Sequence, residues 1–98
     1  MPSRRSLEIS DEAEQDLEDI FNYSTKTWGA NQAAVYSDSI MDAIRDLAEF
    51  PELGRVREDI APGARGRRVR DHVIVDRLDG DTILIDRVYH VRRDPARS

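Results

Sequence analysis

The sequence predicts an α+β fold, in which an N-terminal strand and an antiparallel helical hairpin pack on a small antiparallel sheet in the order β-α-α-β-β-β. Three observations predict it. Two long segments with helical periodicity are separated by a single glycine, three short segments with strand character follow, and a hairpin-type turn separates the last two. A chain of 98 residues supplies one modest core, so residues 1–98 are expected to form a single domain.

Residues 6–10 alternate polar and apolar side chains, which predicts a short strand with one buried face. A helix of about 17 residues is expected next, because Ser10 or Asp11 can accept a hydrogen bond from its first free N–H groups. Gly29 is expected to end this helix in a left-handed C-cap. The stripe predicted to face the core consists of Ala13, Leu17, Ile20, Phe21, Ser24 and Trp28.

A second helix is expected from Ala30 or Asn31 to just before Pro51, since proline disfavours helical geometry in the residue that precedes it. The short link between the two helices predicts an αα-hairpin. Trp28 and Tyr36 are expected in the hairpin core or at its rim. The predicted buried face of the second helix consists of Ala33, Ser37, Ile40, Ile44, Leu47 and Ala48, with Ala34 and Met41 beside it.

The second half of the chain predicts one long loop, residues 51–66, followed by three strands. The strands are expected over residues 66–71, 72–78 and 82–90, and Asp79-Gly80-Asp81 forms the tight turn between the last two. Segments 73–75 and 83–85 are apolar on both faces, whereas the helical hairpin can cover only one face. Two explanations remain open: the long loop shields the second face, or another chain covers it.

The composition excludes several classes of site. There are no cysteines, so disulfides, thiolate zinc sites and cysteine nucleophiles are absent, and two histidines are too few for a histidine-rich metal site. The carboxylates at positions 76, 79, 81 and 86 lack the spacing of a metal-binding loop, so no metal or cofactor is expected. No apolar segment approaches the roughly 20 residues that span a bilayer. We therefore expect a cytoplasmic protein with no membrane partner.

The net charge of −5 is unevenly distributed along the chain. Residues 1–54 carry 4 basic and 12 acidic groups, whereas residues 55–98 carry 11 basic groups, all arginines, and 8 acidic groups. The whole chain lacks the basic footprint of a nucleic-acid-binding domain, so no direct specific nucleic-acid binding is expected. The second half can still supply a local basic patch.

Four arginines of that half, Arg65, Arg67, Arg68 and Arg70, lie within six positions. On a strand over residues 66–71, Arg68 and Arg70 would share one face, because side chains alternate along a strand. Such a cluster could bind phosphates or the carboxylates of a partner in bidentate geometry. The alternative, a charged edge strand protected from aggregation, is favoured by the spacing alone.

His90 follows Tyr89 at the end of the last predicted strand, and Arg92 and Arg93 come directly after it. A histidine in such surroundings could act as a general acid in phosphodiester cleavage. The structural alternative is a half-buried histidine bonded to the backbone or to Asp94. This alternative is favoured, because no motif fixes a second proton-transfer group.

Short motifs in a fixed order extend over residues 7–94. In the first half they are Ala13-x-x-x-Leu17-x-x-Ile20-x-x-Tyr23, Trp28-Gly29-x-x-x-Ala33 and Leu47-Ala48-x-x-Pro51-x-x-Gly54-Arg55. In the second half they are His72-Val73-Ile74-Val75, the Asp79-Gly80-Asp81 turn and Arg87-Val88-Tyr89-His90-x-x-Arg93-Asp94. On these motifs the chain resembles the ParE toxins of the RelE/ParE superfamily, the toxin half of bacterial type II toxin–antitoxin (plasmid stabilisation) modules. The resemblance implies a helical hairpin packed on an antiparallel sheet.

The resemblance also implies a function. A ParE-like toxin inhibits DNA gyrase, has no catalytic residue of its own, and is neutralised by direct binding of its cognate ParD-like antitoxin. Arginine forks pair well with carboxylates, so we expect the antitoxin to contact Arg65, Arg68, Arg70 and Arg93.

The alternative function is that of a RelE-like, ribosome-dependent mRNA endonuclease. In that case the catalytic residues would be His90, Tyr89, Arg68, Arg70 and Arg93. Cleavage of RNA also needs a general base, and the only lysine, Lys26, lies in the first predicted helix. Gyrase inhibition is therefore the preferred prediction, and whether the chain is an enzyme depends on this choice.

Overall fold

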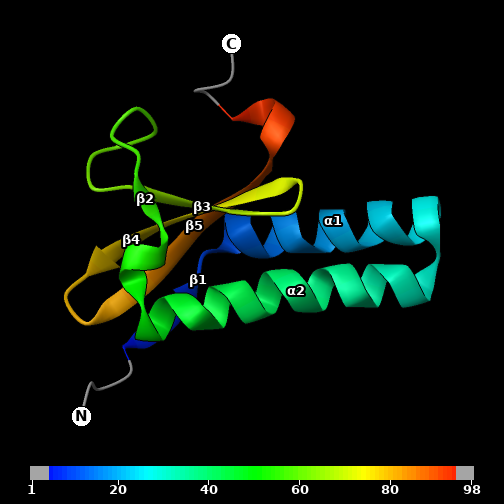
Figure 1. The fold of residues 1–98 in the computed structure, drawn as a ribbon, viewed down its shortest axis with the longest axis horizontal. Coiled ribbons are helices and arrows are strands. Elements are labelled where there is room, and N and C mark those ends of the chain that lie inside the picture. The colour runs from blue at the N-terminus through cyan, green and yellow to red at the C-terminus, as the bar shows by residue number, and fades with distance from the viewer. Residues whose placement is uncertain (1–4, 95–98) are drawn as a thin grey trace.

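The computed structural model describes residues 5–94, which form two helices packed on one five-stranded sheet (Figure 1). The elements in chain order are β1 (Ser6–Ile9), α1 (Asp11–Trp28), α2 (Ala30–Glu49), a 3₁₀ turn (Pro51–Leu53), β2 (Arg55–Val56), β3 (Arg65–Val69), β4 (His72–Asp79), β5 (Thr82–His90) and a second 3₁₀ turn (Val91–Arg93). The predicted α+β class and the hairpin-on-sheet arrangement are confirmed.

The two helices begin and end at the predicted residues. The Ser10 hydroxyl accepts a hydrogen bond from the Ala13 N–H at 3.0 Å, which caps the start of α1. Gly29 separates the helices: its N–H donates to the Thr25 carbonyl, and its carbonyl accepts from the Ala33 N–H. Its φ of +90° is positive as expected, but its ψ of 166° is extended rather than left-handed helical. One glycine thus ends α1, reverses the chain and starts α2.

The strand order is β1-β5-β4-β3-β2, and the sheet is mixed rather than purely antiparallel. The pairs β2–β3, β3–β4 and β4–β5 are antiparallel, but β1 lies parallel to β5, with Ser6 opposite Thr82 and Ile9 opposite Ile85. The helical hairpin that follows β1 carries the chain from this edge of the sheet to the opposite edge, where β2 lies. Because β1 and β5 are not joined by a hairpin turn, they can lie parallel.

Two strand predictions are corrected. The loop expected over residues 51–66 contains the two-residue strand β2, which pairs with β3 at the edge of the sheet. Strand β3 ends at Val69 rather than at residue 71, because Arg70 has a φ of +54° and begins the turn into β4. A positive φ is rare for a residue with a side chain and breaks the alternation of an extended strand.

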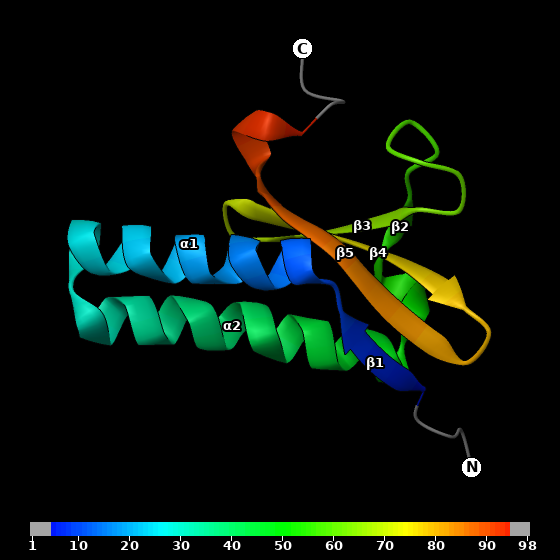
Figure 2. The ribbon, with the colours of Figure 1, turned by 180° about the vertical axis from the view of Figure 1, so that it is seen from behind.

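The main core lies between the hairpin and the sheet. Ile40, Ile44 and Leu47 of α2 are fully buried, as predicted, and Leu17 and Ile20 of α1 are partly buried against the same cluster. Phe21 was predicted to be buried but is 41% exposed. The hairpin extends well beyond the sheet in both views of the fold, so the outer end of α1 has no strand beside it (Figures 1 and 2).

The helix face of α2 also differs in detail from the prediction. Tyr36 and Ala43 are buried although neither was placed on the predicted face, and Ala34, which was placed beside it, is exposed. Trp28 lies exposed at the rim of the hairpin, and Tyr36 lies in its core.

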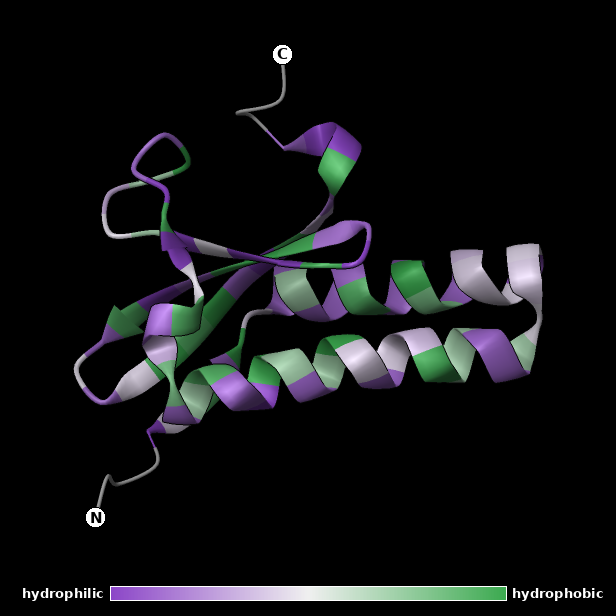
Figure 3. Ribbon diagram, viewed as in Figure 1, coloured by the Kyte–Doolittle hydropathy of each residue, from purple (hydrophilic) through white to green (hydrophobic). Residues whose placement is uncertain are grey.

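The second face of the sheet is covered by the chain itself over part of its area. Val73, Val75 and Ala64 form a second buried cluster, with Ile60 and Tyr89 packed against it. Residues 57–64 belong to the loop between β2 and β3, so the loop explanation is confirmed for segment 73–75. The hydropathy colouring shows apolar residues on the central strands and polar residues at most of the loops and turns (Figure 3).

Helix α1 is fastened to β5 where β1 ends. The Ser10 N–H donates to the Ile85 carbonyl at 3.0 Å, and the Ser10 hydroxyl donates to the Asp86 carbonyl at 2.8 Å. Further along, the Asp16 carboxylate accepts from the Val88 N–H at 2.9 Å and from the Arg87 guanidinium at 2.8 Å. The free edge of β5 is thereby satisfied by α1 instead of by a strand. Neither helix within residues 5–94 is long and apolar enough to cross a membrane.

Candidate functional site

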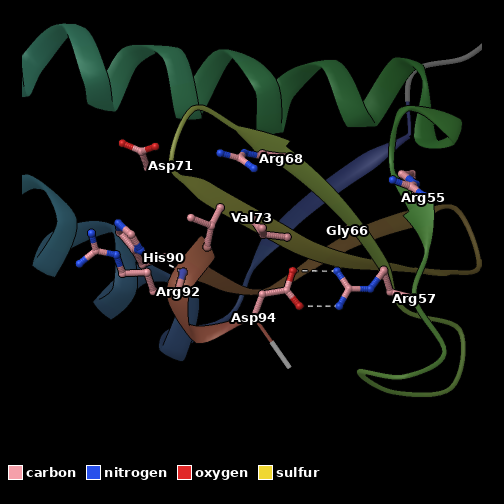
Figure 4. A pocket seen from close by; sticks show the side chains of 10 residues that line it. Arg55, Arg57, Gly66, Arg68, Asp71, Val73, His90, Arg92 and Asp94 are labelled. Carbon is pink, nitrogen blue, oxygen red and sulfur yellow. Dashed lines mark hydrogen bonds and ion pairs between the residues drawn. The ribbon is translucent and has the colours of Figure 1, made fainter. Parts of the chain in front are cut away.

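Two open cavities meet around His90. The first, the basic cavity, has a volume of about 800 Å³ and includes Arg55, Arg68, Val73, His90 and Arg92 in its lining (Figure 4). The second, the aromatic groove, has a volume of about 570 Å³ and includes Tyr23, Trp28, Tyr36, His72 and His90. Asp71, His90 and Arg92 line both cavities, so acidic, basic and imidazole side chains lie together at this end of the sheet.

The pairing of β4 with β5 builds the centre of this region. His72 at the start of β4 lies directly opposite His90 at the end of β5, and their rings meet edge to face with centroids 5.2 Å apart. Helix α2 adds Tyr36, whose hydroxyl lies 2.5 Å from His72 Nδ1. The Asp71 N–H donates to the same hydroxyl at 3.3 Å. Three elements far apart in the sequence therefore converge on one point.

The protonation of this cluster follows from its burial. Burial raises the pKa of Tyr36, so its hydroxyl stays protonated at neutral pH. Burial, aided by the neighbouring His90, lowers the pKa of His72 to about 4, so His72 is neutral. The Tyr36 hydroxyl and His72 Nδ1 therefore share one hydrogen bond between two neutral groups, and the tautomer of the ring sets which of them donates. This arrangement makes His72 a fixed structural partner rather than a proton carrier near pH 7.

His90 is held by the backbone. Its Nδ1 accepts a hydrogen bond from the Arg92 N–H at 3.1 Å, which caps the 3₁₀ turn that follows β5. This agrees with the expectation of a backbone bond, but the other expected partner, Asp94, binds Arg57 instead, with contacts of 2.5 and 3.0 Å. Nε2 of His90 has no hydrogen-bond partner among residues 5–94, and the residue lines both cavities.

The arginines predicted to bind a partner do not form one surface. Arg65 donates to the Gly54 carbonyl at 3.0 Å. In the sheet it pairs with Asp76, which lies four residues from His72 along β4. Arg68 lines the basic cavity, Arg70 lies over the Tyr36 ring at 5.7 Å, and Arg93 lines the aromatic groove.

The expectation that Arg68 and Arg70 share a strand face is wrong. Arg70 has left the strand, and its carbonyl accepts a hydrogen bond from Arg68 Nε at 2.8 Å. Tyr89 lines the aromatic groove together with His90 but also reaches the other face of the sheet. It packs on the second cluster opposite Val73, and Arg87 lies over its ring at 5.1 Å.

Three residues of this region were not predicted to belong to a site: Tyr36, which was expected only in the hairpin core or at its rim, Asp71 and His72. Asp71 is exposed and, among residues 5–94, is the one acidic residue that lines both cavities with His90. A signal existed for His72, because the Asp79-Gly80-Asp81 turn predicts a hairpin that brings the start of β4 close to the end of β5. Among residues 5–94, no group of three or more His, Asp or Glu side chains is arranged to hold a metal ion.

Comparisons with known proteins agree with this architecture. The family model of the ParE toxin of the type II toxin–antitoxin system, parDE, matches residues 7–95. Toxin ParE1 of Caulobacter vibrioides is 37% identical over 82 residues, which are 84% of each chain. Toxin ParE1 of Mycobacterium tuberculosis is 34% identical over 91 residues, which are 92% of this chain and 93% of the relative.

Two solved structures share the fold. A chain of the chromosomal ParDE system from P. aeruginosa aligns with a TM-score of 0.79 at 22% identity, over 89% of this chain and 96% of that one. A chain of the RelBE2 toxin–antitoxin complex of Mycobacterium tuberculosis aligns with a TM-score of 0.62 at 24% identity, over 90% and 99%. The match over nearly the whole length, and relatives above 30% identity, show that this chain belongs to the ParE toxin family of type II toxin–antitoxin systems.

Proposed function

We propose that this ParE-type toxin inhibits DNA gyrase by binding and is neutralised by direct contact with a cognate ParD-like antitoxin. The observation that carries the proposal is the match to the ParE toxin family over residues 7–95, which covers both helices and all of the sheet except Ser6. Gyrase inhibition is the activity that the resemblance to ParE toxins implies.

The chemistry around His90 supports a binding protein over a nuclease. Its ring neighbour His72 is neutral, and Nδ1 of that residue is occupied by the Tyr36 hydroxyl. The Asp94 carboxylate is paired with Arg57. A nuclease needs an acid and a base that can exchange protons near neutral pH, and these groups are already committed to structural contacts.

One observation favours the second candidate, an mRNA endonuclease. Asp71, His90 and Arg68 line the same basic cavity, so a carboxylate, an imidazole and a guanidinium are available around one space. In an endonuclease, Asp71 would be the base, His90 the acid and Arg68 the cation that stabilises the phosphorane-like transition state.

The antitoxin would have to wrap around the domain rather than dock on one face. Arg68, Arg70 and Arg93 point into different surroundings, and Arg65 is turned towards the Gly54 carbonyl. A partner that meets these arginines with carboxylates therefore needs a long segment, and we expect it to bury more than roughly 1,200 Å². Apolar side chains outside the core would supply contacts along the way: Phe21, Tyr23, Trp28, Val35, Phe50, Leu53, Val56 and Leu78.

The experiment compares two activities of the purified chain. The proposal predicts inhibition of gyrase supercoiling and accumulation of gyrase–DNA cleavage complexes, reversed by the antitoxin, with no cleavage of mRNA on ribosomes. Ribosome-dependent cleavage with gyrase unaffected would establish the endonuclease instead.

The variant His90→Ala adds a measure of magnitude. Loss of a catalytic acid costs roughly 10²–10⁴-fold in rate, whereas loss of one side chain from a binding surface costs less than about 30-fold in most cases. A folded His90→Ala protein whose ribosome-dependent mRNA cleavage falls by more than about 100-fold from that of the wild type contradicts the binding proposal.

A further inference from the structure

Aromatic rings form a continuous series from the tip of the hairpin to His90. Tyr23 meets Trp28 edge to face with centroids 6.3 Å apart, and Trp28 meets Tyr36 at 6.4 Å. Tyr36 in turn meets His72 at 5.5 Å, and His72 meets His90 at 5.2 Å. Successive contacts of this kind give one extended surface, and all five rings line the aromatic groove.

The outer end of the series does little for the fold. Tyr23 is 65% exposed and Trp28 is 55% exposed, and neither belongs to a core cluster. Both belong to the outer half of α1 (Asp11–Trp28), and the outer end of this helix extends beyond the sheet (Figures 1 and 2). Large aromatic rings outside the core expose apolar surface to water, which is unfavourable. Their presence at a groove therefore points to a binding role.

The series is held in place before any partner arrives. Trp28 touches a ring on each side, and the central ring, Tyr36, is fixed by its hydrogen bonds to His72 and Asp71. The guanidinium of Arg70 lies 5.7 Å from the centre of the Tyr36 ring. A partner that binds here therefore pays little to order these side chains, which favours tight binding.

The composition of the groove matches that of energetic centres in protein interfaces. Tryptophan, tyrosine and arginine dominate such centres, and this groove gathers Trp28, Tyr23 and Tyr36 with Arg92 and Arg93. Neither Arg92 nor Arg93 forms an ion pair with another residue in the range 5–94. These two arginines can donate hydrogen bonds to carboxylates of a partner at the end of the groove nearest β5.

The charges around the groove favour a protein over a nucleic acid. Three carboxylates and three arginines line it, so it has no excess of basic groups, and the chain as a whole has a net charge of −5; these residues are Asp16, Asp19, Asp71, Arg87, Arg92 and Arg93. A polyanion lying along the rings would pass these carboxylates, whereas a protein segment can place an apolar side chain on the rings and an acidic one on the arginines.

We infer that the aromatic groove is the surface on which this toxin binds gyrase, through an apolar side chain seated against Tyr23 and Trp28 and carboxylates bound by Arg92 and Arg93. The inference rests on the proposed function and assigns a surface to it. The basic cavity, on this inference, is not needed for contact with gyrase.

The test uses the full chain with Tyr23→Ala and Trp28→Ala, singly and together, and Phe50→Ala as the matched control. Phe50 is 50% exposed at the other end of α2, so its removal takes away a similar exposed ring far from the groove. Each single groove variant is expected to weaken binding to immobilised gyrase, and inhibition of supercoiling, by at least about 10-fold. The control should stay within about 2-fold, and Trp28→Phe should recover most of the loss.

Other measurements keep the test decisive. Thermal unfolding by circular dichroism should show that all variants remain folded, because both rings lie outside the core. Groove variants that inhibit gyrase as well as the wild type, or that lose only antitoxin binding, overturn the groove as the gyrase surface while the proposed function stands. A groove-dependent affinity for a fluorescent oligonucleotide in the absence of gyrase assigns the groove to nucleic acid and also overturns it. A wild-type chain that fails to inhibit gyrase refutes the proposed function itself.

Discussion

Asp76 is a buried carboxylate whose charge is only partly compensated, and replacing it with asparagine should stabilise the fold. It is 1% exposed, and neither of its carboxylate oxygens has a hydrogen-bond partner among the described residues. Burial raises the pKa of Asp76 to about 6; the charge of Arg65 opposes this rise and that of Asp86 adds to it. Asparagine has nearly the same shape and no charge, so Asp76→Asn removes the cost of burying the ion.

The size of the effect follows from the shift. A rise from 3.8 to about 6 is about 2 pKa units, and each unit corresponds to about 1.4 kcal/mol, which gives about 3 kcal/mol. The folded state holds this proton more tightly than the unfolded chain does. Protonation of Asp76 therefore contributes stability that is fully present below pH 4, declines as the pH rises towards 6, and stays low above pH 6. The advantage of Asp76→Asn should grow from near zero at pH 4 to about 3 kcal/mol at pH 7.

His72 makes the free energy of unfolding depend on pH in the opposite direction. The pH dependence of the wild type alone therefore does not reveal the contribution of Asp76. Burial lowers the pKa of His72 to about 4, below its ordinary value of 6.5. A depressed histidine pKa means that stability is lost as the pH falls below 6.5. The two trends oppose each other between pH 4 and 6.5, and the difference between variant and wild type isolates the carboxylate.

The assay is urea unfolding followed by circular dichroism from pH 4.5 to 7.5. Protein concentrations are kept low, because the sequence pI is about 4.9 and solubility is least near that pH. Asp79→Asn, at an exposed position beside the β4–β5 turn, is the control and should change the free energy of unfolding by less than about 0.5 kcal/mol. A difference between Asp76→Asn and wild type that is constant with pH, or a variant less stable at pH 7, would refute the reasoning.

Three further predictions follow from the core, the ring cluster and the arginines. Ile44→Ala should lower the free energy of unfolding by about 2–5 kcal/mol in urea titrations, whereas Phe21→Ala, at a half-exposed position, should lower it by less than about 1 kcal/mol. The ring protons of His72 should titrate in NMR spectra with a midpoint near 4, not near 6.5. Reversing the charges of Arg68 and Arg70 together should slow antitoxin association and weaken its salt dependence; an unchanged rate at low salt would exclude these arginines from the docking surface.

The elements with strong local signals could be predicted from the sequence. Both helices have a periodic apolar stripe, and their ends are marked by Ser10, Gly29 and Pro51, so their limits were correct within a residue or two. Strand β2 carries no such signal. It has two residues, both exposed, and exists because the loop before β3 lies against the sheet edge, which only the tertiary structure determines.

The prediction that Phe21 is buried was wrong for a related reason. A helical stripe shows which side of α1 is apolar but not how far the sheet extends along it. Leu17 and Ile20 pack on the core, and the outer end of α1 extends beyond the sheet (Figure 1). Residues beyond that point, including Tyr23 and Trp28, are left for other contacts, so an apolar stripe longer than its support indicates a surface as much as a core.

A single irregularity in β5 explains why the candidate site could not be predicted from alternation. Val75 pairs with Arg87 and Asp76 pairs with Ile85, which leaves Asp86 as an extra residue, a β-bulge. Strict alternation from Ile83 and Ile85 would direct Arg87 and Tyr89 towards the helices. Instead Val88 joins Ile83 and Ile85 in the main core, and Tyr89 packs with the second cluster.

The same shift determines what His90 can reach. Because the bulge advances the register by one residue, His90 rather than Tyr89 lies opposite His72, on the side where α2 supplies Tyr36. The ring series from Tyr23 to His90 therefore depends on Asp86, which contacts none of these rings but whose carbonyl accepts the Ser10 hydroxyl at the start of α1. The hydrogen bond that begins the hairpin also holds the bulge, and in this way the helix whose far end carries Tyr23 and Trp28 is tied to the strand that carries His90.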